Sequence, residues 1–354
     1  MKVVCATRVG NMKDPNPETR GTVGIVDMPV KELKDDEVLI KVAYCGICGS
    51  DPHVVDGCFN KPEDAPFGIG HEMSGVIEKL GRNATAKGLK VGDRVGGNFL
   101  GYCGKCYQCS IGHPEYCTDV GNEPCMAEYV VWNESQVCKL PDGVSLREGS
   151  LMEPLSIAVR AMDKAGMQVG KCVLISGGGP IGQLCAQLAA KFGAAELTLS
   201  EPVESRCELA KKIGVEHIIN PVTEDVYERA MEITNGLGYD VIIECSAVPS
   251  AAETVLKCTA KYANLLYVAQ FPTDYELPLN LFEYSYMRQV NITGMYCAHF
   301  NFERTAEYLK YVDLSAFTSD EQVYDIDDVE AAFAMHLTSK YPKILIRCNK
   351  FEGE

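Results

Sequence analysis

The pattern of apolar positions divides the chain into two kinds of sequence. Up to about residue 150, short β-branched runs such as residues 38–44 and 75–80 stand between glycines and prolines. Runs of this kind, separated by turn-forming residues, are typical of β-strands joined by tight loops. The first part of the chain is therefore predicted to form a compact β-rich domain.

The pattern changes after about residue 155, where short apolar runs alternate with helical segments. Residues 172–176 (CVLIS) fit a buried strand, and residues 181–193 have apolar side chains at helical spacing. The segments 196–201 and 205–214 repeat this order, which continues to about residue 270. Strands alternating with helices predict a parallel sheet covered on both faces. Two further helices and a strand are expected at 302–309, 329–337 and 343–348.

Length and composition narrow the class of protein. A chain of 354 residues is long for a single core, so two domains are expected. No apolar stretch approaches the ~20 residues that span a bilayer, and no apolar signal segment is visible, so we expect a cytoplasmic location. The net charge of −16 argues against nucleic acid or an anionic membrane surface as partner, because both require basic patches.

Four cysteines lie close together in the segment CGKCYQCSIGHPEYC, with the spacing C-x2-C-x2-C-x7-C. Four thiolates on a tight loop match the tetrahedral sulfur coordination of zinc and leave no open position, which predicts a structural zinc site. An iron–sulfur cluster is the rival, but a common iron–sulfur run has a shorter last gap followed by proline. The predicted zinc ligands are Cys103, Cys106, Cys109 and Cys117.

A glycine-rich loop follows the predicted strand CVLIS and opens the next predicted helix. Gly177, Gly179 and Gly182 match the pattern G-x-G-x-x-G. These glycines allow a tight turn and a close approach of the backbone to a pyrophosphate, which then binds at the helix N-terminus. A dinucleotide site is therefore predicted here, with Pro180 and Ile181 as further members of the loop.

Glu201 ends the next predicted strand, 19 residues after Gly182. A carboxylate at this place would hydrogen-bond the ribose hydroxyls and repel a 2′-phosphate, which favours NAD over NADP. The alternative is an ordinary solvated charge at the end of a strand. Arg206, which could contact the adenine or accept a 2′-phosphate, keeps NADP open.

These motifs also fall in a familiar order along the chain. Together with GICGSDPH (46–53), GHE (70–72) and EPL (153–155), they resemble the zinc-containing medium-chain dehydrogenases over nearly the whole sequence. The chain is most similar to the sorbitol and threonine dehydrogenase branch, since the alcohol dehydrogenases of the family have a cysteine where Glu153 stands.

The resemblance implies an α/β fold with a GroES-like β-rich catalytic domain and a Rossmann domain built on a doubly wound parallel sheet. The catalytic domain is expected at residues 1–158 and 301–354, and the Rossmann domain at 159–300. The active site is expected in the cleft between them, with NAD at the carboxyl ends of the strands. The resemblance further implies a homo-oligomer, either a tetramer or a dimer.

By the same resemblance, Cys48, His71 and Glu72 are candidate ligands of a catalytic zinc, with Glu153 as an alternative or exchanging ligand. Zinc with one thiolate, one carboxylate and one imidazole is formally neutral and keeps a position for water or the substrate oxygen. There the metal acts as a Lewis acid, and hydride passes to NAD. Both carboxylates bound together would give one negative charge and oppose alkoxide formation, so only one is expected to bind at a time.

The residues after Cys48 are candidates for moving the alcohol proton. Ser50 matches the hydroxyl that bonds the alcohol in this family, and His53 stands where other members have a relay histidine. Asp51 matches a carboxylate that would orient His71. The alternatives are a surface histidine at 53 and a turn-stabilising aspartate at 51.

By the same resemblance, Phe59 and Tyr296 are candidate residues of the substrate pocket. Sorbitol-type enzymes have an arginine before this tyrosine, and Met295 in its place indicates a less polar pocket. We expect an NAD-dependent oxidoreductase for a secondary alcohol, such as a polyol, a cyclitol or a sugar-derived alcohol. A threonine-type 3-hydroxy amino acid dehydrogenase is the alternative. A non-catalytic dinucleotide-binding protein and a zinc-free quinone-type reductase rank lower, because the metal ligands are present.

Overall fold

The computed structural model describes residues 1–58 and 60–353, which divide into two compact units. The first unit comprises Met1–Pro154 and His299–Glu354, and the second comprises Leu155–Ala298. Both boundaries lie a few residues before the predicted ones. Within the described ranges, none of the helices combines the length and apolar character that a membrane crossing requires.

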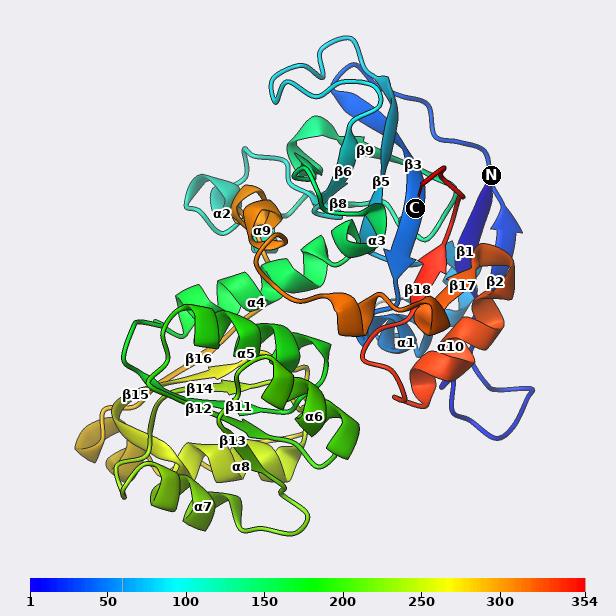
Figure 1. The fold of residues 1–354 in the computed structure, drawn as a ribbon. Helices are drawn as coiled ribbons and strands as arrows, with labels where there is room; N and C mark the ends of the chain where they lie inside the picture. Colours follow the sequence, from blue (N-terminus) through cyan, green and yellow to red (C-terminus); the bar gives the residue numbers. More distant parts are fainter. Residues whose placement is uncertain (59, 354) are drawn as a thin grey trace. The chain divides into compact units, whose positions relative to one another are not determined.

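The second unit is built on one parallel sheet of six strands (Figure 1). In sheet order the strands are β13 (His217–Ile219), β12 (Glu196–Ser200), β11 (Cys172–Ser176), β14 (Tyr239–Glu244), β15 (Thr259–Tyr267) and β16 (Asn291–Gly294). The chain thus starts in the middle of the sheet, builds outward to one edge, and then returns to build the other half. This order is that of the doubly wound dinucleotide-binding sheet, as predicted.

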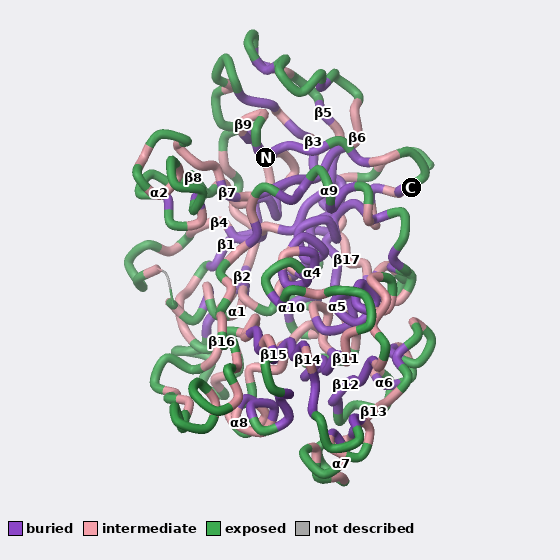
Figure 2. Tube along the Cα trace, turned by 90° about the vertical axis from the view of Figure 1, so that its left-hand side faces the viewer, coloured by how far each residue is buried: buried purple, intermediate pink, exposed green. Residues whose placement is uncertain are grey.

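Helices connect these parallel strands, as crossover connections require. They are α5 (Pro180–Lys191), α6 (Glu204–Lys212), α7 (Val226–Ile233), α8 (Pro249–Lys257) and the π-helical turn η4 (Phe282–Met287), and α4 (Met152–Lys164) precedes the first strand. Burial is concentrated in β11, β12, β14 and α5, whereas the residues of α7 are mostly half-buried or exposed (Figure 2). One core cluster of this unit joins Leu174, Tyr239, Ile242 and Leu265.

The first unit is rich in β-strands, as its glycine- and proline-punctuated sequence predicts. A small sheet contains β2 (Thr22–Asp27), β1 (Lys2–Arg8) and β4 (Phe67–Gly68). The larger sheet runs β10 (Val137–Lys139), β6 (Arg94–Gly97), β5 (Glu72–Leu80), β3 (Glu37–Gly46), β18 (Leu345–Arg347) and β17 (Val323–Asp325), and β9 (Tyr129–Asn133) also pairs with β3. A two-stranded ribbon is formed by β7 (Leu100–Gly101) and β8 (Gly121–Asn122).

Short helices close the first unit. The α-helices are α1 (Ser50–Val55), α2 (Tyr107–Ser110), α3 (Leu146–Gly149), α9 (Phe302–Tyr308) and α10 (Val329–Leu337). The 3-10 turns are η1 (Pro62–Asp64), η2 (Pro114–Tyr116), η3 (Glu134–Gln136), η5 (Ser315–Phe317), η6 (Asp320–Gln322) and η7 (Ile326–Asp328). The core of this unit includes Ile40, Met73, Trp132, Phe333 and Ile346, so both of its chain segments contribute.

Three elements differ from the sequence-based expectations. The predicted strand 343–348 is shorter, because Lys343 lies before β18 and turns its side chain into the unit. Helix α4 and the turn η4 were not predicted.

Candidate metal and nucleotide sites

The four cysteines of the 103–117 segment come together in the first unit. Their sulfur atoms all lie within 4.8 Å of one another. The backbone N–H groups of Cys103 and Asp119 donate to the sulfur of Cys117 at 3.4 Å, and that of Cys106 donates to the sulfur of Cys103 at 3.3 Å. Gly104 has a φ of +68° and so permits the turn between the first two cysteines. The segment thus folds as a closed thiolate site.

The ionisation of these thiols fits a cation at their centre. Backbone N–H groups of Cys109 and Thr118 lower the pKa of Cys106 to about 6. Burial and the neighbouring Cys106 raise the pKa of Cys109 to about 12. Four sulfurs this close cannot all lose their protons without a positive charge between them. A zinc ion would supply that charge, and the donor set is one that zinc prefers.

A second group of metal-ligating side chains lies elsewhere in the first unit. The ligand atoms of Cys48, His71 and Glu72 lie within 4.8 Å of one another. Cys48 comes from the loop between β3 and α1, while His71 directly precedes β5 and Glu72 is its first residue. Because β3 and β5 are antiparallel neighbours, the end of one strand meets the start of the other. The sheet therefore places these three residues together, as the resemblance implies.

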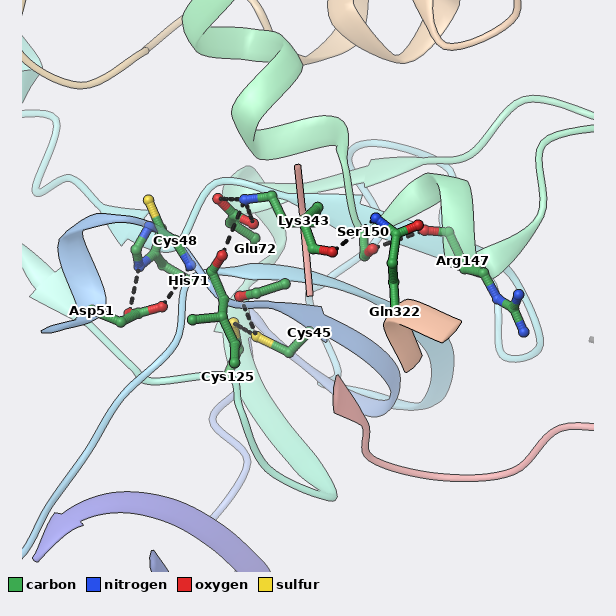
Figure 3. A network of polar contacts seen from close by, with 12 residues as sticks. Cys45, Cys48, Asp51, His71, Glu72, Cys125, Arg147, Ser150, Gln322 and Lys343 are labelled. Carbon is green, nitrogen blue, oxygen red and sulfur yellow. Dashed lines mark hydrogen bonds and ion pairs between the residues drawn. The ribbon is translucent and has the colours of Figure 1, made fainter. Parts of the chain in front are cut away.

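Asp51 contacts two residues of this group, Cys48 and His71 (Figure 3). Its Oδ2 accepts a hydrogen bond from the Cys48 backbone N–H at 2.8 Å, and its Oδ1 lies 3.5 Å from His71 Nδ1. Burial opposes ionisation of the His71 imidazole, but Cys48 and Asp51 raise its pKa well above the ordinary value. Asp51 itself is buried. It is therefore placed to orient His71, which is how carboxylates support histidine ligands of metals.

Glu153, the expected exchanging ligand, is the second residue of α4 and is buried. It is not one of the three residues whose ligand atoms are grouped. Burial raises the pKa of its carboxyl to about 7, while His71 acts in the opposite direction. Glu72 also influences this pKa, so the two carboxyl groups lie close enough to interact.

The candidates for proton transfer and substrate contact differ in their placement. Ser50 and His53 lie on α1; the Ser50 side chain is half-buried and that of His53 is exposed. Tyr296 belongs to the second unit and is exposed, with Met295 half-buried beside it. Phe59 lies outside the described residues.

The glycine loop has the close packing that its motif predicts. Gly177 has a φ of +92°, and a Cβ atom there would lie 2.9 Å from the Ser246 backbone. A Cβ atom on Gly182 would lie 1.8 Å from the Gly177 carbonyl oxygen. A Cβ atom on Gly179 would meet no described atom within 4 Å. The space beside Gly179 is what a pyrophosphate needs to approach the start of α5, where Pro180 and Ile181 begin the helix.

Glu201 is bound to this loop by its carboxylate. Its Oε2 accepts a hydrogen bond from the Gly178 N–H at 2.6 Å, and its Oε1 accepts one from the Val203 N–H at 2.9 Å. The side chain is buried, so it is not the solvated surface charge of the alternative interpretation. Arg206 Nη1 lies 3.6 Å from Glu201 Oε2.

Three polar residues of these sites were not identified from the sequence. Lys343 is buried, and its Nζ donates to both carboxylate oxygens of Glu72 at 2.7 and 2.8 Å. Gln183 donates to the carbonyl oxygens of Gly178 and Arg206. Glu244 is buried at the end of β14, where burial raises its pKa. No local motif marks these three residues.

Comparison with known families agrees with this geometry. Residues 34–142 match the family described as alcohol dehydrogenase GroES-like domain, and residues 180–314 match the one described as zinc-binding dehydrogenase. A sorbitol dehydrogenase of Bacillus subtilis is 30% identical over 352 residues, which covers 96% of this chain and 98% of that protein. The chain belongs to the zinc-dependent medium-chain dehydrogenases.

Two further relatives bear on the branch of this dehydrogenase family. An L-threonine 3-dehydrogenase of Pyrococcus furiosus is 35% identical over 280 residues, covering 76% of this chain and 79% of that one. A solved structure from Clostridium scindens, described as a candidate zinc-binding dehydrogenase, has a TM-score of 0.90 and 33% identity, and covers 98% of this chain and 99% of that one. The medium-chain dehydrogenase described here is thus an oxidoreductase that acts on alcohol groups, with the threonine type as the alternative branch.

Proposed function

We propose that this enzyme transfers a hydride between NAD and a secondary alcohol of the polyol, cyclitol or sugar-derived class. The observation that supports this most directly is the grouping of Cys48, His71 and Glu72 within 4.8 Å. One thiolate, one imidazole and one carboxylate are a donor set for zinc that leaves a position for a substrate. Zinc would supply Lewis acidity toward the alcohol oxygen, and NAD would accept the hydride.

The residues around the metal ligands have roles in positioning and proton transfer. Asp51 fixes the Cys48 backbone and the His71 ring, so both ligands are held before a metal arrives. We assign the alcohol proton to Ser50, and its release to water to His53, whose imidazole is exposed to solvent. Both residues lie on α1, so one short helix provides the relay.

The nucleotide preference follows from Glu201. Its buried carboxylate beside the glycine loop repels the 2′-phosphate of NADP and can accept hydrogen bonds from ribose hydroxyls. Arg206 lies within ion-pair distance of this carboxylate, so its positive charge is partly compensated. We therefore assign NAD as the nucleotide.

The threonine-type alternative differs in substrate charge. A 3-hydroxy amino acid needs a cation for its carboxylate, whereas a polyol needs only hydrogen-bonding groups. Met295 is apolar where sorbitol-type enzymes have an arginine, so neither requirement is met at this position. For that reason the substrate panel must contain polyols, cyclitols and threonine together.

We further propose that the enzyme is a homo-oligomer in the cytoplasm. Strand β16 forms the edge of the parallel sheet, and exposed apolar side chains lie around it and on η4: Leu281, Phe282, Tyr286, Met287 and Ile292. A strand edge beside exposed apolar residues is suited to pairing with a second copy. The cysteines are all free thiols, which fits a reducing compartment. Light scattering after gel filtration tests the assembly, and a monomeric mass would contradict it.

The first experiment combines zinc content per chain with NAD reduction over the substrate panel. We expect about two zinc ions per chain and turnover of at least one secondary alcohol. Cys48→Ser should remove one zinc and abolish turnover, while the matched control Cys58→Ser, at an exposed position, should change neither. Full activity of the Cys48→Ser variant would refute the proposed metal site.

A further inference from the structure

Lys343 is a buried lysine next to the candidate metal ligands of the first unit. Only 3% of its surface is exposed, and only 1% of that of Glu72. Its ammonium group donates to Glu72 Oε1 at 2.8 Å, to Glu72 Oε2 at 2.7 Å and to the Ile47 carbonyl oxygen at 3.2 Å. A lysine has three N–H donors, so all three have an acceptor. Figure 3 shows the ammonium pointing directly at the carboxylate.

The sheet explains why this lysine reaches the site. Gly46 of β3 pairs with Glu72 of β5 on one side and with Leu345 of β18 on the other. Lys343 lies two residues before Leu345 and so enters the same layer of the unit. An isolated buried ammonium is unfavourable, and so is an isolated buried carboxylate, and each here compensates the other. The pair therefore depends on β18 being in register with β3.

The ion pair leaves Glu72 able to bind a metal. A carboxylate has about four lone-pair sites, and the two contacts with Lys343 use one on each oxygen. The remaining sites are available to an ion held by Cys48 and His71, whose ligand atoms lie within 4.8 Å of that of Glu72. Lys343 thus fixes the position of the carboxylate without replacing the metal.

Lys343 also changes the charge balance of the centre. A zinc ion with one thiolate and both carboxylates, Glu72 and Glu153, would carry one negative charge. That balance omits the buried ammonium, which makes the same assembly neutral. The buried Asp51 carboxylate beside His71 adds a further negative charge, so Lys343 compensates one carboxylate of the centre and not the whole of it.

We propose that Lys343 is a positioning residue and fixed counter-charge of the catalytic metal centre. It holds Glu72 beside Cys48 and His71, and its ammonium compensates the negative charge of the Glu72 carboxylate. This inference rests on the proposed function insofar as it assumes a metal at Cys48 and His71.

The test measures zinc affinity by chelator competition, with Cys48→Ser identifying which bound zinc belongs to this centre. Lys343→Met should weaken that zinc by about 10- to 100-fold, as loss of a partner of a metal ligand does, and leave the four-cysteine zinc unchanged. The matched control is Lys340→Met, an exposed lysine of the same segment, which should alter neither affinity. Equal affinity in Lys343→Met and wild type would overturn the proposal.

A second comparison separates positioning from folding. If Lys343 acts through Glu72, adding Lys343→Met to Glu72→Gln should change zinc affinity less than twofold, because the partner is already altered. The double variant also removes both buried charges together, so it should unfold at a higher temperature than Lys343→Met alone. Additive losses of affinity would overturn the proposal. Equal zinc content and affinity in wild type and Cys48→Ser would instead overturn the proposed function and this inference with it.

Discussion

Gly46 and Glu72 lie opposite each other on β3 and β5, and a Cβ atom on Gly46 would fall 2.2 Å from Glu72 Oε2. The carboxylate therefore occupies space that any other residue at position 46 would fill. This gives Gly46 a definite role: it admits a charged side chain against the backbone of a central strand.

Gly46→Ala should displace the Glu72 carboxylate and weaken the metal centre. We expect the variant to retain the four-cysteine zinc and to lose most of the other, with zinc content falling toward about one ion per chain. Metal analysis after dialysis checks this. Gly121→Ala is the matched control, since a Cβ there would have its nearest contact at 3.8 Å, an ordinary distance. Two tightly bound zinc ions in Gly46→Ala would contradict the expectation.

Glu201→Ala should weaken NAD binding and relax the preference against NADP. The change removes the carboxylate that accepts the Gly178 and Val203 N–H groups. Loss of a charge-assisted hydrogen bond of about 1.5–3 kcal/mol corresponds to roughly 10- to 100-fold in affinity. The KM for NAD and the ratio of kcat/KM for NAD and NADP report it. Glu204→Ala, at an exposed position at the start of α6, serves as the control. An unchanged ratio of kcat/KM in Glu201→Ala would show that Glu201 supports the loop but does not select the nucleotide.

Cys106→Ser should remove the zinc of the four-cysteine loop and loosen the segment around it. Because a structural zinc contributes directly to the free energy of folding, we expect the first thermal unfolding midpoint to fall by more than about 5 °C. Calorimetry and zinc content measured on the same sample check this. A strong chelator should reproduce the effect in the wild-type protein. An unchanged midpoint together with a lost zinc would show that this loop adds little to stability.

His336 should make the protein less stable in mild acid. Burial and the positive charge of Lys343 lower the pKa of this imidazole to about 4, against an ordinary value of 6.5. Between these values the unfolded chain binds a proton that the folded chain does not, so stability falls as the pH drops from 6.5 toward 4. His336→Gln should reduce this loss by about 2 kcal/mol. Urea unfolding at pH 7 and pH 4.5 measures the difference, and parallel pH profiles would exclude the histidine as its source.

The parts of the molecule that could be predicted from the sequence are those whose residues lie close together in it. The four cysteines fall within one loop, and the strand, glycine loop and α5 follow one another directly, so spacing alone indicates their chemistry. The grouping of Cys48 with His71 and Glu72 was implied only by family resemblance. It depends on antiparallel pairing of β3 with β5, which no local pattern specifies.

The contacts that could not be predicted join residues far apart in the chain. Lys343 and Glu72 are separated by 271 positions, and Glu201 and Gly178 by 23. A lysine before an apolar strand ordinarily points to water, and only the register of β18 against β3 places this one in the interior. The charge balance drawn from the ligands alone was therefore incomplete.

Strand β18 lies between β3 and β17 in the larger sheet. Lys343, two residues before this strand, stands 296 residues after Ile47, whose carbonyl oxygen it contacts. As the chain leaves the ribosome, every residue of the second unit emerges before this strand does. The parallel sheet can therefore form while the larger sheet still has an open edge along β3. Until Lys343 and β18 emerge, the Glu72 carboxylate lacks the ammonium group that contacts it in the folded unit. The group of Cys48, His71 and Glu72 can therefore reach its final surroundings only after the second unit has left the ribosome.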